Sequence, residues 1–238
     1  MIKLKLQIDT TMKLGTNYGG WDLPYDARLD SQSIVYSGGV GEDISFDLLL
    51  QDKYDCHLFL IDPTKKAITH FDEIKKAYAT QQFIFSGSIQ PDYLPIIQPL
   101  HPNFDKFTYL PLGIWHKKDV LSFYRQDNNE YVSQSIIPGM FGKKYDTVPV
   151  LSIKEFMSKL GHSHIDLLKL DIEGAEVQSL QQMIKDQIYP TYLCIEFDLL
   201  LKNKDPLDET KQIIQKLLQI GYQIVVNNNL NITFQLIK

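Results

Sequence analysis

Cysteine is scarce in this sequence, and the two residues present, Cys56 and Cys194, lie far apart and inside apolar runs. This pattern argues against a disulfide framework or a cysteine metal site, so we expect two reduced, buried thiols. Long hydrophobic runs are absent too, since no stretch approaches the roughly 18 apolar residues of a membrane span. Residues 1–9 lack the apolar core and cleavage site of a signal peptide. We therefore expect a cytoplasmic protein with no membrane partner.

An excess of positive charge is also missing. The chain has 24 Lys plus Arg against 29 Asp plus Glu, a net charge of −5. Such a chain has no general attraction for phosphate backbones, so we expect no nucleic-acid partner. What remains is an ordinary globular composition of 238 residues, 44% hydrophobic and 22% charged, which suits one α/β domain with a buried core. Nothing in the sequence indicates an oligomeric state.

Short apolar runs alternate with helical patterns along the chain, which is typical of βαβ units around a mostly parallel sheet. Strands are predicted over residues 33–36, 56–61, 107–112, 165–170 and 192–195, and a terminal hairpin over 222–226 and 232–237. Helices are predicted over 42–50 and 65–79, between a capping box at 152–155 and Gly161, around 177–184, and over 205–217. These elements predict a seven-stranded sheet closed by the hairpin.

We expect residues 1–238 to form a single domain. Residues 1–32 are predicted to cover it as an N-terminal segment. Residues 86–106, rich in proline, and 117–150, with a hairpin of strands at 121–125 and 131–136, interrupt the α/β rhythm. Insertions of this kind usually shape a substrate mouth, so we expect both near one.

A glycine turn follows the first predicted strand of the sheet. Gly39 and Gly41 let the backbone pass close to a ligand at the start of a helix. Asp62 follows the second strand, where an acidic residue accepts hydrogen bonds from a ribose diol. The glycines alone would suit a tight structural turn, but together with Asp62 they indicate a nucleoside-containing cofactor.

The end of this turn indicates which cofactor. A dinucleotide fingerprint requires a third small residue, whereas this turn has Ile44 there, preceded by Glu42 and Asp43. The two acids would repel a pyrophosphate and suit the ammonium group of an amino-acid moiety, as in S-adenosylmethionine. A nicotinamide-dependent oxidoreductase is therefore disfavoured, and a nucleoside-binding module without transferase activity stays open.

Four segments match known motifs in order: Tyr36–Asp47, Leu60–Thr64, Leu167–Glu176 and Cys194–Phe197. They resemble the FkbM-type methyltransferases of the class I S-adenosylmethionine-dependent fold, and Leu167–Glu176 is the most specific match. The resemblance covers about residues 15–200 and departs at Asp198, a position that is often histidine in the family. It implies an α/β, Rossmann-like three-layer sandwich with a seven-stranded mixed sheet and an antiparallel terminal hairpin strand.

The resemblance also implies roles for individual residues. Gly39, Val40, Gly41 and Glu42 would hold the methionine part of the cofactor, Asp62 the ribose, and Pro63, Gly113, Ile114 and Trp115 would surround the adenine. Asp171 would face the transferred methyl group and so touch the cofactor, with Glu196 in the same cleft. Tyr18 and Trp21, as a lid or as aromatic anchors, and Asp198 would lie on the substrate side.

The two acids Asp171 and Glu196 are the candidate catalytic residues. A hydroxyl acceptor must lose a proton during methyl transfer, so a nearby carboxylate is the natural base. The same pair could instead hold a divalent cation, Mg²⁺ or Mn²⁺, and the sequence does not separate these options. Glu173 and Glu176 also suit an exposed helix turn, where an acid complements the helix dipole, so we assign them no catalytic role. The family resemblance favours O-methylation of a sugar, in a glycan or nucleotide-sugar, or of a secondary metabolite.

Overall fold

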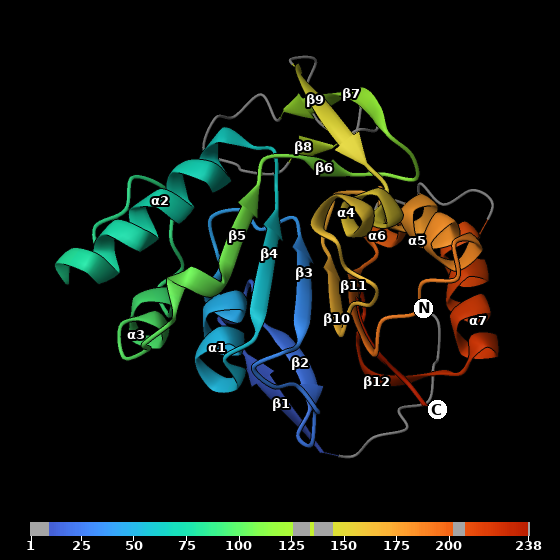
Figure 1. Cartoon of the computed structure of the whole chain (residues 1–238), viewed down its shortest axis with the longest axis horizontal. Coiled ribbons are helices and arrows are strands. Elements are labelled where there is room, and N and C mark those ends of the chain that lie inside the picture. The colour runs from blue at the N-terminus through green and yellow to red at the C-terminus, as the bar shows by residue number, and fades with distance from the viewer. Residues whose placement is uncertain (1–9, 126–133, 136–144, 202–207, 238) are drawn as a thin grey trace.

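The computed structural model describes residues 10–125, 134–135, 145–201 and 208–237. Its centre is a seven-stranded sheet with the strand order β12-β13-β11-β10-β3-β4-β5 (Figure 1). Five strands run parallel: β3 (Ile34–Gly38), β4 (His57–Ile61), β5 (Phe107–Leu110), β10 (Leu167–Leu170) and β11 (Tyr192–Glu196). β13 (Asn231–Leu236) pairs antiparallel with β11 and with β12 (Tyr222–Asn228), which confirms the mixed sheet and its terminal hairpin.

Helices cover both faces of this sheet, because its strands are apolar on both sides. One core contains Leu168 and Ile195 and is covered by α4 (Ile153–Leu160), α5 (Glu176–Lys185) and α7 (Glu209–Ile220). The other contains Val35 and Cys194 and is covered by α1 (Ser45–Tyr54), α2 (Lys65–Thr80) and α3 (Tyr93–Ile97). The result is the predicted three-layer α/β sandwich (Figure 1).

Two helices differ from their predicted bounds. α1 begins at Ser45 rather than at residue 42, because the Asp43 carboxylate accepts hydrogen bonds from the backbone N–H and hydroxyl of Ser45 and holds the preceding residues in a turn. α7 begins at Glu209 and continues to Ile220, where Gly221 ends it in the left-handed conformation. The predicted start at residue 205 lies outside the described residues. α4 has the predicted capping box and ends at Gly161.

The two segments that interrupt the α/β rhythm contain more regular structure than the sequence suggested. Within 86–106 lie α3 and a 3₁₀ turn, Phe104–Lys106. Strands β9 (Tyr145–Leu151), β7 (Asp119–Arg125) and β8 (Gln134–Ser135) of the second segment form a small sheet with β6 (Gly113–Ile114), which precedes the segment. The strand order is β6-β9-β7-β8, and the sheet lies beyond the carboxyl ends of β4 and β5 (Figure 1). β7 and β8 pair antiparallel, as predicted for the hairpin, whose turn and remaining residues lie outside the described residues. β9 was not predicted.

The described part of the N-terminal segment forms a hairpin of β1 (Thr11–Leu14) and β2 (Trp21–Pro24). Trp21 and Leu23 are buried in the same core as α1, and β2 contacts both β12 and β13. Cys56 and Cys194 are free and buried, as predicted. None of the described helices is long and apolar enough to cross a membrane.

Candidate active site

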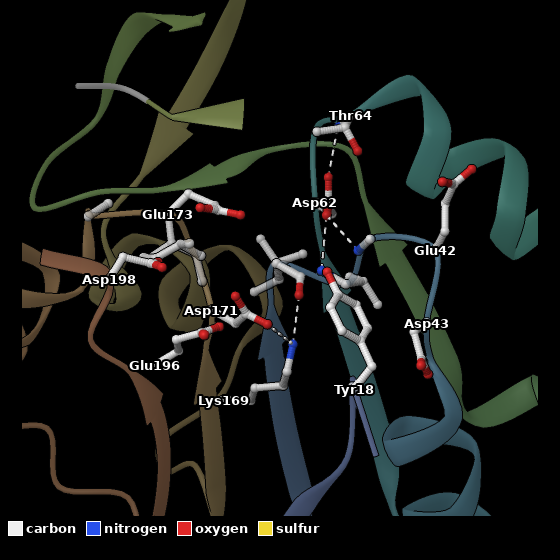
Figure 2. A pocket seen from close by; sticks show the side chains of 18 of the residues that line it. Tyr18, Glu42, Asp43, Asp62, Thr64, Lys169, Asp171, Glu173, Glu196 and Asp198 are labelled. Atoms are coloured by element: carbon white, nitrogen blue, oxygen red, sulfur yellow. Dashed lines mark hydrogen bonds and ion pairs between the residues drawn. The ribbon is translucent and has the colours of Figure 1, made fainter. Parts of the chain in front are cut away.

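A cavity of about 650 Å³ lies at the carboxyl ends of β3, β4, β10 and β11 (Figure 2). This is where ligands bind in open parallel sheets, and the volume is in the range of small-molecule sites. Most of the predicted site residues line it: Tyr18, Trp21, Gly39, Val40, Gly41, Glu42, Asp62, Pro63, Gly113, Ile114, Asp171, Glu196 and Asp198. Ser88 and Phe123, from the two interrupting segments, line it as well.

Trp115 is the exception among the predicted site residues, because it is not part of the cavity lining. Its backbone N–H bonds to the carbonyl of Leu151. Its side chain packs against the small core of Phe123, Val148 and Val150 and beside His116. The indole ring of Trp115 thus packs on the second sheet, and its predicted place near the adenine stays a prediction.

The glycine turn requires its glycines for a steric reason. Gly39 has φ +73° and Gly41 φ +60°, a region that side chains with a Cβ avoid. A Cβ on Gly39 would lie 1.6 Å from the carbonyl oxygen of Asp171, so the turn and the end of β10 touch directly. Gly39 also donates a hydrogen bond to the carbonyl of Ile61. The turn is thus fixed between β4 and β10.

The Asp62 carboxylate organises this turn from the cavity side. One oxygen accepts hydrogen bonds from the N–H groups of Val40 at 2.9 Å and Gly41 at 3.0 Å, and the other accepts from Thr64 at 2.8 Å (Figure 2). A carboxylate can accept about four hydrogen bonds, so Asp62 still has room for a hydroxyl donor. The N–H groups that would bind a pyrophosphate are already taken by a negative charge. This arrangement disfavours a dinucleotide.

Glu42 and Asp43 lie across the cavity from Asp171 and Glu196 (Figure 2). The Glu42 carboxylate approaches Lys66 Nζ at 3.9 Å, and a Cβ on Gly87 would meet it at 2.1 Å. Burial raises the pKa of Glu42, and the charge of Lys66 opposes that rise. Asp43 accepts hydrogen bonds from Ser45 and, at 2.5 Å, from the Thr16 hydroxyl. The predicted contact of Glu42 with the methionine part stays a prediction.

Three carboxylates meet at the other side of the cavity. Oxygen atoms of Asp171, Glu196 and Asp198 lie within 4.8 Å of one another. The pairing of Leu170 with Ile195 places Asp171 beside Glu196 at the ends of neighbouring parallel strands. Burial, the charge of Asp171 and a hydrogen bond with its side chain raise the pKa of Glu196 to about 10. A pKa this high corresponds to a Glu196 carboxyl that keeps its proton at neutral pH and donates it in a hydrogen bond to Asp171.

Lys169 is a site residue for which the sequence analysis assigned no role. Its side chain is 4% exposed, and its Nζ donates a hydrogen bond to the carbonyl oxygen of Gly39 at 2.6 Å and lies 3.6 Å from an oxygen of Asp171. Burial raises the pKa of the nearby Asp47 to about 6, while the positive charge of Lys169 opposes that rise. A lysine inside a buried strand, between Leu168 and Leu170, was the available signal.

Glu176 also suited an exposed helix turn by its sequence, but the structure buries it fully. Its carboxyl oxygen accepts hydrogen bonds from the N–H groups of Ile172 and Gly174 and so closes the turn after β10. Burial and then the charge of Asp198 raise its pKa well above the usual range. Glu173 lies in the same turn with φ +55° and lines the cavity.

Tyr18 and Trp21 have different surroundings. Tyr18 is 71% exposed at the cavity mouth, and partial burial of its hydroxyl, then the charge of Asp171, raises its pKa. Trp21 is 3% exposed and packs in the core of the sandwich while also lining the cavity. Trp21 is therefore placed to anchor the N-terminal hairpin on the core. Tyr18 is exposed enough for a bound ligand to move its side chain.

The fold and this cavity define an α/β protein with a site at the carboxyl ends of its parallel strands, and sequence comparison identifies its family. Residues 48–224 match the family described as the Methyltransferase FkbM domain. The chain therefore belongs to the FkbM methyltransferase family, and membership implies that it uses S-adenosylmethionine. No curated protein matches the chain.

One solved structure shows a weak similarity to this chain. It is described as an rRNA methylase from Streptococcus thermophilus, and the similarity has a TM-score of 0.42 at 10% identity. It covers 88% of this chain and 90% of that one. A similarity of this size does not indicate a shared substrate.

The cavity fits S-adenosylmethionine by the chemistry of its lining. The cofactor carries a positive sulfonium, and Asp171 and its acidic neighbours give the cavity negative charge on that side. The Asp62 carboxylate, held beside the glycine turn, has acceptor capacity left for a ribose hydroxyl. These are the groups that would hold the cofactor.

Proposed function

We propose that this methyltransferase transfers the methyl group to a hydroxyl oxygen of a sugar, in a glycan or nucleotide-sugar, or of a secondary metabolite. The observation that carries the proposal is the hydrogen-bonded pair of Asp171 and Glu196 in the same cavity as the glycine turn. An oxygen acceptor has to lose its proton as it takes the methyl group, and a carboxylate within reach supplies the base.

When bound, S-adenosylmethionine supplies a methyl group whose bond to sulfur breaks, leaving the electron pair on sulfur, while a carbon–oxygen bond forms and the hydroxyl proton is released. Asp171 accepts that proton in this proposal. Glu196, protonated at neutral pH, donates a hydrogen bond to Asp171 and holds it in place. The cavity walls position the acceptor hydroxyl. This positioning supplies most of the rate enhancement, because the leaving group is already activated by its positive charge.

A divalent cation is the alternative use of the same carboxylates. Asp171, Glu196 and Asp198 could hold Mg²⁺ or Mn²⁺, which would lower the pKa of the acceptor hydroxyl. Glu196 would then have to lose its proton, because carboxylates bind metal in the ionised form. Activity that a chelator abolishes, and that added Mg²⁺ or Mn²⁺ restores, would distinguish this alternative.

We further infer a small-molecule or glycan acceptor in the cytoplasm rather than nucleic acid. The net charge of −5 and the acidic cluster support this, because both repel phosphate groups. The acidic cluster also supports transfer over mere nucleoside binding, which would not require three carboxylates in the cavity.

Calorimetry against S-adenosylhomocysteine and NAD tests the cofactor assignment, with a methyl-donor turnover screen over sugars and nucleotide-sugars as the second step. We expect S-adenosylhomocysteine to bind and NAD not to bind, and at least one sugar hydroxyl to be methylated. Binding of NAD alone would overturn the proposal. Methylation at nitrogen or carbon only would overturn its oxygen acceptor.

A further inference from the structure

A second cavity, of about 660 Å³, adjoins the active-site cavity. It lies between two turns that are far apart in the sequence, the turn joining β1 to β2 and the turn joining β12 to β13. Asn17, Tyr18, Trp21 and Asn231 line both cavities. A ligand in the second cavity can therefore reach the carboxylates of the first without leaving the protein surface.

Side-chain amides dominate the polar lining of the second cavity. Asn17, Asn228, Asn229 and Asn231 all contribute to it. Each amide offers two donors and an acceptor, which matches hydroxyl groups, because a hydroxyl both donates and accepts. Tyr18 and Trp21 add aromatic surface, and the C–H face of a sugar ring is apolar enough to pack on such rings.

Charge is sparse and balanced in the second cavity. Among the described residues that line it, Lys13 and Asp22 are the charged ones, and Lys13 Nζ already lies 3.4 Å from the side-chain oxygen of Asn17. The adjoining cavity presents the acidic cluster of Asp171 and its neighbours. A pyrophosphate would be repelled by that cluster and would find little compensation here. The ligand that fits is uncharged.

Asn231 connects the two cavities. It is directly opposite Glu196 in the antiparallel pairing of β13 with β11, so the two side chains share a face of the sheet. Turn geometry accounts for Asn229, which has φ +63°, and Asn228 bonds to Asp22 at 3.3 Å. Neither explanation applies to Asn231. Within the part of the chain that the structure describes, its side-chain amide makes no hydrogen bond to another residue. Its amide is available to a ligand.

We infer that the second cavity binds an uncharged, polyhydroxylated part of the acceptor, such as the sugar residue next to the one that is methylated. The inference rests on the proposed function and narrows it. The acceptor is an oligosaccharide or glycoside of at least two units, and a nucleotide-sugar is disfavoured. Asn231 positions that acceptor from beside Glu196.

The inference can be tested by measuring how the protein binds to an array of neutral oligosaccharides of one to six residues in the presence of S-adenosylhomocysteine. Nucleotide-activated monosaccharides on the same array serve as paired probes. We expect the wild type to be retained on at least one neutral oligosaccharide of two or more residues. Asn231→Ala should weaken that binding at least tenfold while the dissociation constant for S-adenosylhomocysteine changes less than twofold. Gln215→Ala, an exposed amide on α7, is the matched control and should change neither.

If Asn231→Ala does not fold, Asn17→Ala replaces it as the test variant and should weaken oligosaccharide binding in the same way. Asn17 lies on the exposed turn that joins β1 to β2. Three results would overturn the inference. The wild type could be retained on nucleotide-sugars alone, or its retention on neutral oligosaccharides could be unchanged in the asparagine variants. It could also bind S-adenosylhomocysteine and yet be retained on no oligosaccharide. Failure of the proposed function looks different, because the wild type would then not bind S-adenosylhomocysteine or would methylate no oxygen.

Discussion

Lys169 Nζ and the carbonyl oxygen of Gly39 form a 2.6 Å hydrogen bond between residues 130 positions apart. The bond ties the glycine turn after β3 to the strand that ends in Asp171. Because Lys169 also lies 3.6 Å from the Asp171 carboxylate, one buried cation contacts both the predicted cofactor turn and the predicted base.

Lys169→Met should therefore disturb folding and cofactor binding together. The substitution removes the hydrogen bond to the Gly39 carbonyl and the ion pair with Asp171, and it takes away the positive charge near the buried Asp47. Breaking a buried ion pair costs about 3–5 kcal/mol. We expect the free energy of unfolding in urea to fall by that order and S-adenosylhomocysteine to bind at least about tenfold more weakly. Lys216→Met, at an exposed position on α7, should change the unfolding free energy by less than about 0.5 kcal/mol. Equal effects of the two variants would contradict the role given to Lys169.

Gly39 and Gly161 offer a matched test of the glycine turn. Both have nearly the same φ, +73° and +75°, but a Cβ on Gly161 has no atom within 4 Å, whereas on Gly39 it would meet the Asp171 carbonyl oxygen. Gly161→Ala should cost only the left-handed backbone strain, about 1–2 kcal/mol. Gly39→Ala should cost more and abolish binding of S-adenosylhomocysteine, measured by urea unfolding and calorimetry. Similar unfolding free energies with intact binding would show that the turn is not constrained by β10.

Asp62→Ala should weaken S-adenosylhomocysteine binding by roughly 1.5–3 kcal/mol, the range for charge-assisted hydrogen bonds. It should also lower the melting temperature, because the N–H groups of Val40 and Gly41 lose their acceptor. Asp72→Ala, at an exposed position on α2, controls for loss of a surface carboxylate. An unchanged dissociation constant for Asp62→Ala in calorimetry would remove Asp62 from the cofactor site and leave it a structural cap.

Asp171→Asn should lower the methyl-transfer rate by about 10²–10⁴, the usual weight of general base catalysis, while S-adenosylhomocysteine affinity is nearly kept. The measurement is turnover with the acceptor found in the screen, with and without EDTA. If the carboxylates hold a cation instead, EDTA should abolish wild-type activity and Glu196→Gln should be equally damaging. Full turnover of Asp171→Asn under both conditions would rule out both mechanisms.

The pH dependence of stability should change in Glu196→Gln. The pKa of Glu196 rises on folding from its usual 4.5 to about 10, so the folded state holds this proton more tightly than the unfolded state. The stability it contributes is complete below about pH 4.5 and is lost as the pH rises toward about 10. Melting temperatures measured from pH 5 to 9.5, with chelator present, should therefore fall less steeply in Glu196→Gln than in the wild type. Parallel curves would show that Glu196 ionises normally in the folded protein.

The strands of the sheet, and the edge at which the candidate site residues lie, follow from the amino-acid pattern. Apolar strands alternating with amphipathic helices require a sheet buried on both faces, and parallel strands bring their carboxyl ends to one edge. Gly39, Asp62 and Asp171 could therefore be placed near one another before any contact was known, since each directly follows a strand.

The contacts of the charged side chains, in contrast, depend on the folded arrangement of the whole chain. The buried hydrogen bond of Lys169 to Gly39, the three N–H groups held by Asp62 and the burial of Glu176 depend on contacts that no local pattern encodes. The same holds for Trp115, whose ring packs against the core of the second sheet, and for Asn231, which lies opposite Glu196 because β13 pairs with β11. Hydrophobic periodicity fixes which face of an element is buried, but a charged or amide side chain takes its partners from whatever the folded chain brings within about 3 Å of it.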